Sequence, residues 1–115
     1  MGGEEMQKIS NCEFEQIMSY NKRNNICIEI NFCVDSNANY TSCWLGKLNS
    51  KENSEVVYWF GLMADGSEAY EFDSKKQFLE AKVFNGKSIK DIWELVTIIS
   101  IDGCEVEERL PYYLA

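Results

Sequence analysis

Residues 26–35 of the chain read ICIEINFCVD, and this stretch decides the fold. Apolar side chains occupy every second position from Ile26 to Val34, with small or polar side chains between them. Successive side chains of a strand point to opposite faces of a sheet, so this period of two predicts a strand with one buried face. The rest of the chain must then supply neighbouring strands and a cover for that face.

Three further strands are expected downstream of this one. Residues 35–39 have turn composition, and residues 40–48 are expected to form a second strand. Residues 56–63 are apolar on both faces, which predicts a central strand covered by helices on both sides. Asp65 and Gly66 form a hairpin signal, and alternation over residues 68–72 completes a four-stranded meander.

A helix is expected immediately upstream of the first strand. Ser10 and Glu13 form a capping-box pattern, in which each side chain accepts a backbone N–H at the start of the helix. Ile9 and Phe14 are placed to pack together across that start. Apolar residues then recur at helical spacing, and polar residues 21–25 end the helix.

A second capping-box pattern predicts a short helix after the meander. Ser74 and Gln77 supply the pattern, and Phe78 and Leu79 follow as the apolar side of the helix. The dipeptide at residues 85–86, Asn-Gly, is a turn signal that ends it.

The last third of the chain predicts another helix and a final strand. Ser88 can cap the helix with Asp91 three residues later, and four apolar residues fall on one helical face: Ile89, Ile92, Trp93 and Val96. Residues 97–101 are β-branched and suit a strand. Acidic residues 105–109 suit one helical turn before Pro111.

These patterns predict an α+β fold: a mainly antiparallel sheet of four to five strands, with an N-terminal helix and two short helices packed on it. A chain of 115 residues without repeats or linkers is expected to form one domain, residues 1–115. Residues 1–8 are polar, and we expect them to be flexible.

Charge is the strongest compositional feature. The chain has 19 Asp and Glu residues against 11 Lys and Arg residues, a formal net charge of −8. Nucleic-acid binding needs clustered basic side chains, which this chain lacks, so that class of partner is disfavoured. An acidic surface attracts basic proteins through long-range electrostatic steering, although it also serves solubility alone.

The chain shows no apolar run long enough to span a membrane and no secretion-type apolar segment near its start, so we expect a cytoplasmic protein. The five cysteines follow no zinc-ligand spacing, and we expect free thiols that pack as small hydrophobic side chains. Lysine is much commoner than arginine, which suggests a bacterial source of low GC content.

Catalytic motifs are absent from the sequence. The chain contains no histidine and no glycine-rich, nucleophile-elbow or metal-ligand motif, so we expect no enzyme, no cofactor and no metal. Acid–base chemistry by two carboxylates stays open, with Glu29 and Glu71 as the candidates if the sheet brings them together.

Residues 84–93 read FNGKSIKDIW and residues 101–103 read IDG. With these segments, its size, its acidity and its lack of catalytic motifs, the chain resembles the small acidic immunity proteins of bacterial toxin systems, including contact-dependent inhibition. The resemblance is one of general character and assigns no residue roles. It implies a cytoplasmic α+β domain that covers the active site of a basic toxin domain and so neutralises it.

An interface for a basic protein should combine carboxylates with an aromatic anchor. Two surfaces qualify. The first is the hairpin of Asp65, Glu68 and Glu71, with Trp44 or Trp59 if either is exposed. The second is C-terminal and comprises the following residues: Asp102, Glu105, Glu107, Glu108, Tyr112 and Tyr113.

Two other functions remain open. One is a small-molecule-binding domain or minor enzyme with an aromatic pocket between sheet and helices, lined by Trp44, Trp59, Tyr58 and Phe72. The other is a structural homodimer that pairs through an edge strand, since few prolines protect the strand edges.

Overall fold

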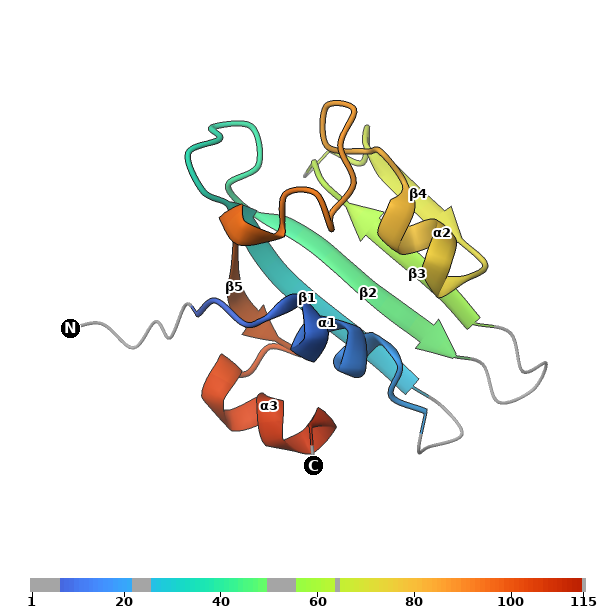
Figure 1. The fold of residues 1–115 in the computed structure, drawn as a ribbon, viewed down its shortest axis with the longest axis vertical. Coiled ribbons are helices and arrows are strands. Elements are labelled where there is room, and N and C mark those ends of the chain that lie inside the picture. The colour runs from blue at the N-terminus through green and yellow to red at the C-terminus, as the bar shows by residue number, and fades with distance from the viewer. Residues whose placement is uncertain (1–6, 22–25, 50–55, 64, 115) are drawn as a thin grey trace.

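The computed structural model describes residues 7–21, 26–49, 56–63 and 65–114. These residues form one five-stranded antiparallel sheet with three α-helices and a short 3-10 helix (Figure 1). The strands lie in the order β4-β3-β2-β1-β5. This arrangement confirms the predicted α+β class.

The strands are β1 (Ile26–Val34), β2 (Cys43–Asn49), β3 (Val56–Gly61), β4 (Ala69–Phe72) and β5 (Val96–Ile101). β1 pairs with both β2 and β5, and its apolar positions are buried as the alternation predicts. The second strand begins at Cys43 and not at residue 40, because the Val34 N–H donates to the Tyr40 carbonyl (2.8 Å) and holds residues 35–42 in a loop.

α1 (Asn11–Met18) begins as the sequence predicts. Ser10 Oγ accepts from the Glu13 N–H (3.0 Å), and Glu13 Oε1 accepts from the Ser10 N–H (3.0 Å). α2 (Lys75–Glu80) begins at Ser74, whose hydroxyl accepts from the Gln77 N–H (3.1 Å). Residues 22–25, most of the polar segment predicted to end α1, lie outside the described residues. Residues 50–55, before β3, lie outside them too.

The third predicted helix is wrong in type. Ser88 and Asp91 do form the reciprocal capping bonds (3.0 and 3.2 Å), but turns and the short 3-10 helix η1 (Trp93–Leu95) follow them. The Trp93 indole donates to the Ile9 carbonyl (2.7 Å) and stacks on Phe14, with ring centroids 4.4 Å apart. These contacts bury the predicted apolar residues without a regular helix, and the chain enters β5 at once.

The C-terminal helix is longer than expected. α3 spans Val106–Tyr113 and continues through Pro111, where the sequence predicts a single turn before the proline. Its far end is fixed because the Tyr113 hydroxyl donates to the Asp102 carboxylate. This contact holds the helix end beyond Pro111, which has no N–H to donate within the helix.

The helices cover one face of the sheet. α1 lies over β1 and β2 in Figure 1, and α2 lies over β3 and β4. The core between them is aromatic, with Phe60 stacked on Phe78 (centroids 4.4 Å apart). The expectation of helices on both sides of β3 is therefore wrong: Val57 and Trp59 point away from the core and are only half-buried.

The N-terminal segment is tied to the sheet where it is described. Gln7 and Ile98 exchange backbone hydrogen bonds of 2.9 and 2.7 Å at the β5 edge. Lys8 Nζ lies 2.6 Å from the Asp35 carboxylate, whose pKa this contact lowers. Gln7 and Lys8 are thus hydrogen-bonded to the rest of the fold, the flexibility expected for residues 1–8 stays a prediction, and residues 1–6 lie outside the described part of the chain.

Candidate functional site

The sheet has one face that α1 and α2 leave uncovered, called the open face here (Figure 1). The pairing registers and the burial pattern assign the following residues to it: Cys27, Glu29, Asn31, Cys33, Trp44, Gly46, Leu48, Val57, Trp59, Gly61, Ala69, Glu71, Thr97 and Ser100. None of these is basic, and two are acidic. Trp44 and Leu48 on this face are 39% and 51% exposed.

A row of paired residues crosses the open face. Glu29 pairs with Gly46, Gly46 with Trp59, and Trp59 with Glu71. A methyl group on Gly46 would lie only 2.6 Å from Cζ2 of Trp59, so the Trp59 indole lies across the bare Gly46 backbone.

This placement makes a continuous apolar strip along β2. Trp44 and Leu48 flank Gly46 at two residues on either side, and all three side-chain positions face the same way. The Trp59 ring fills the gap that Gly46 leaves between them. The apolar strip of Trp44, Trp59 and Leu48 therefore lies between the carboxylates of Glu29 and Glu71.

The two candidate catalytic carboxylates do not form a pair. Glu29 and Glu71 stand three strand spacings apart, about 14 Å. Two carboxylates that act on one glycosidic bond lie about 5–9.5 Å apart. The open face keeps Glu29 and Glu71 too far apart for that chemistry.

Of the three predicted hairpin residues, the structure places only Glu71 on the open face beside the apolar strip. Glu71 is exposed on the open face next to Trp59, and Glu68 is half-buried where β4 begins. Asp65 is exposed in the turn, and its pKa is lowered because the carboxylate accepts the Ser67 N–H (2.9 Å). At this end of the sheet the Glu71 carboxylate thus lies next to the half-buried Trp59, and Trp44 is the exposed tryptophan of the same face.

The C-terminal residues form a separate surface beyond β5. Glu107 and Glu108 are exposed in the first turn of α3, Glu105 caps that helix, and Tyr112 lies under the Arg109 guanidinium (4.1 Å to the ring centroid). β4 and β5 are opposite edges of the sheet, so the structure does not bring the two predicted surfaces together.

Asp102 is committed to internal contacts. Its carboxylate accepts the Glu29 N–H (2.9 Å), Arg109 Nε (2.8 Å) and the Tyr113 hydroxyl. Burial raises the pKa of Tyr113, and the hydrogen bond to Asp102 raises it further. Asp102 therefore joins β1, β5 and α3 and offers little free acceptor capacity to a partner.

The proposed aromatic pocket does not form. Tyr58 and Phe72 lie on the covered face, where both contact Phe78, whereas Trp44 and Trp59 lie on the open face. The sheet separates the two pairs, so they cannot line one cavity.

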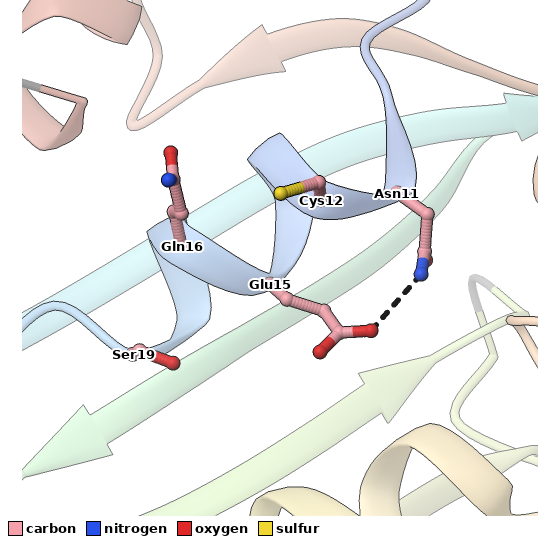
Figure 2. A pocket seen from close by; sticks show the side chains of 5 residues that line it. All are labelled: Asn11, Cys12, Glu15, Gln16 and Ser19. Carbon is pink, nitrogen blue, oxygen red and sulfur yellow. Dashed lines mark hydrogen bonds between the residues drawn. The ribbon is translucent and has the colours of Figure 1, made fainter.

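Two shallow pockets occur elsewhere on the described surface. Figure 2 shows one of about 420 Å³ along α1, where Asn11 and Glu15 point toward each other and are hydrogen-bonded (2.9 Å). Its other lining residues are Cys12, Gln16 and Ser19. The second pocket, of about 540 Å³, lies along residues 33–41. Neither contains any of the four aromatic residues expected to line a pocket.

Lys47 is a buried charge that sequence reasoning misses. It is 3% exposed on the covered face, and its Nζ donates to the carbonyls of Met18 and Tyr20 (both 2.8 Å). Burial lowers the pKa of Lys47, and the positive charge of the nearby Lys75 lowers it further. Lys47 links the C-terminal carbonyls of α1 to β2. The one sequence signal for this buried lysine is an inverted alternation in β2, which places Lys47 on the covered face and Leu48 on the open face.

The five cysteines are free, but only Cys43 is fully buried. Burial raises the pKa of Cys43 to about 11.

We expect iodoacetamide at pH 8 to modify Cys43 at least about 100-fold more slowly than the exposed Cys12, because the thiolate is the reacting form. Peptide mass spectrometry measures both rates, with the urea-unfolded chain as control. Equal rates in the native protein would contradict the buried position of Cys43.

In the part of the chain that the structure describes, no three acidic or cysteine side chains are grouped to hold a metal ion. None of its helices has the length and apolarity to cross a membrane. No protein-family model, curated protein or solved structure matches this chain.

Proposed function

We propose that this protein is an acidic interaction module whose open face binds a basic protein. The observation that carries the proposal is the apolar strip of exposed Trp44 and Leu48 with half-buried Trp59, flanked by Glu29 and Glu71. None of the strand residues assigned to the open face is basic. Large exposed apolar patches with a polar rim mark binding sites. Tryptophan is also one of the residue types enriched at interface hot spots.

Charge decides which class of protein the open face suits. The net charge of −8 favours encounter with a positively charged partner, and Glu29 and Glu71 supply ion-pair partners on both sides of the apolar strip. Apolar burial then supplies affinity and the carboxylates supply orientation.

An immunity protein is the specific form of this function that we favour. Blocking a toxin requires tight binding and no chemistry, and the Glu29–Glu71 separation disfavours paired-carboxylate catalysis on this face. The acidic character suits a basic toxin domain, such as one that acts on nucleic acid. In that role the protein would bind and neutralise its cognate toxin in the bacterial cytoplasm and so protect its own cell.

A positive charge introduced on the open face tests the proposal. Leu48→Lys is expected to weaken binding of the basic partner at least about tenfold, because it removes apolar contact and adds repulsion. Leu95→Lys is the matched control, since Leu95 is 45% exposed but lies on η1, off the open face. Its binding should change less than about twofold.

The partner is first captured from a lysate of the source cells and identified by mass spectrometry, and each variant is then titrated by calorimetry. The immunity role adds a growth assay: the captured protein alone should arrest host cells, and co-expression with the wild type should restore growth. Capture of no basic protein, or equal weakening by Leu48→Lys and Leu95→Lys, would refute the proposed interface.

A further inference from the structure

The edge strand β4 has backbone groups without partners in the described part of the chain. The Leu62 N–H donates to the Glu68 carbonyl (3.0 Å), which makes these two residues a hydrogen-bonded pair of the antiparallel ladder. Such pairs alternate along the ladder. Tyr70 and Phe72 therefore bond to β3, whereas the N–H and C=O groups of Ala69 and Glu71 point outward from the sheet.

The two edges of the sheet differ in protection. At β5, Gln7 already bonds to Ile98 and occupies part of the edge. β4 contains no proline, lysine or bulge. It is only four residues long and carries the Glu71 charge, two features that limit strand addition to short partners of opposite charge. The β4 edge of the described structure therefore suits a short basic strand.

The charges along β4 decide between a second copy of this chain and a basic partner. Glu68, Glu71 and Asp73 lie on or beside the strand. The lysines that follow are turned to other contacts: Lys75 donates to Ser19 Oγ (2.7 Å) and Lys76 pairs with Glu80 (3.2 Å). Two copies would each bring a net charge of −8, and antiparallel pairing centred on Glu71 would place like carboxylates opposite each other, which is destabilising. A basic strand suits this edge better than a second copy.

The side chains of β4 also define the sequence pattern of the incoming strand. Ala69 and Glu71 belong to the open face, whereas Tyr70 and Phe72 lie on the covered face and are only half-buried. Side chains of neighbouring strands align face by face. The incoming strand should therefore alternate, with basic residues beside Glu71 and apolar residues beside Tyr70 and Phe72.

We propose that the β4 edge accepts an extended segment of the basic partner, with alternating basic and apolar residues, as an additional antiparallel or parallel strand. The inference rests on the proposed function, because the segment belongs to the protein that the open face binds. The added strand would continue the open face beyond Glu71, so the edge and the apolar strip form one continuous interface.

Amide hydrogen exchange on the isotope-labelled full chain tests the edge. The probe is a short synthetic peptide of alternating lysine and valine, and its control alternates glutamate and valine. At saturation, the lysine peptide should slow exchange at Ala69 or Glu71 at least about tenfold and leave Tyr70 and Phe72 unchanged, since these already bond to β3. The glutamate peptide should slow none of them.

Two variants separate backbone pairing from charge. Ala69→Pro removes an outward donor but no bond to β3, and should weaken lysine-peptide binding about tenfold. Glu71→Lys keeps the backbone and should reverse the preference between the two peptides. Melting curves show whether each variant is folded, and Glu71→Lys tests the charge argument should Ala69→Pro fail to fold.

Several results would overturn the inference: no lysine-peptide binding at millimolar concentration, binding without protection of Ala69 or Glu71, or light scattering that shows a dimer lost in Ala69→Pro. If these appear while Leu48→Lys still abolishes capture of a basic protein, the proposed function stands without strand addition. If β4 is protected but no basic protein is captured, the proposed function fails instead.

Discussion

Replacing Asp102 with alanine is expected to lower the free energy of unfolding by about 3–5 kcal/mol. The carboxylate is mostly buried, with 13% of the side chain exposed, and it accepts hydrogen bonds from β1 and from two residues of α3. Its removal would leave the Arg109 charge and the Tyr113 hydroxyl without this acceptor. Asp102 also has a φ of 54°, a left-handed conformation that alanine adopts less readily than aspartate.

Chemical denaturation monitored by circular dichroism measures this loss. Asp102→Asn is the control, because asparagine tolerates the left-handed conformation and keeps one oxygen that can accept the Glu29 N–H. Its loss should be clearly smaller than that of alanine. Equal losses in the two variants would show that the carboxylate does not hold α3 on the sheet.

Local sequence patterns correctly predict the elements in which buried apolar residues recur with one regular spacing. The alternation from Ile26 to Val34 gives the bounds of β1, and Ser10 with Glu13 gives the start of α1, because both depend on neighbours within a few residues. The α+β class follows from the order of such elements.

The segment from Ser88 to Val96 shows where local patterns fail. Its capping bonds form, but Val96 must pair with Val34 of β1, and Trp93 must reach the Ile9 carbonyl. Partners that lie more than 60 residues away in sequence decide its conformation. A helical spacing of apolar residues cannot distinguish a regular helix from turns that bury the same side chains.

The site was predictable in composition but not in arrangement. The sequence predicts hairpin carboxylates near Trp44 or Trp59 if either is exposed; Glu71 pairs with Trp59, which is half-buried, and Trp44 is the exposed one. Which carboxylate is free and which is used internally depends on side-chain partners and on the sign of φ at Asp102. Strand register also decides that Lys47 lies inside and Leu48 outside.

Replacing Gly46 with alanine is expected to destabilise the protein by at least about 3 kcal/mol, more than most single overpacking changes. The added methyl group would overlap the Ile28 carbonyl oxygen and lie 2.6 Å from the Trp59 ring. The first of these is backbone in the middle of the sheet and cannot turn away. The variant must therefore distort the β1–β2 ladder as well as displace the indole.

Gly61→Ala is the matched control on the same face of the sheet. There the methyl group would meet only Cζ3 of Trp59 at 3.9 Å, an ordinary contact. We expect a change within about 1 kcal/mol, with the lower entropy of the unfolded chain favouring the alanine variant. Denaturant titration compares the two, and tryptophan fluorescence reports whether the Trp59 indole moves.

The Gly46 result also bears on function. Only a residue without a side chain lets the Trp59 indole lie between Trp44 and Leu48, so the apolar strip depends on this glycine. If Gly46→Ala were as stable as Gly61→Ala and left the fluorescence unchanged, Trp59 could not lie on Gly46. The open face would then lack its central anchor, and the proposed interface with a basic protein would lose its main support.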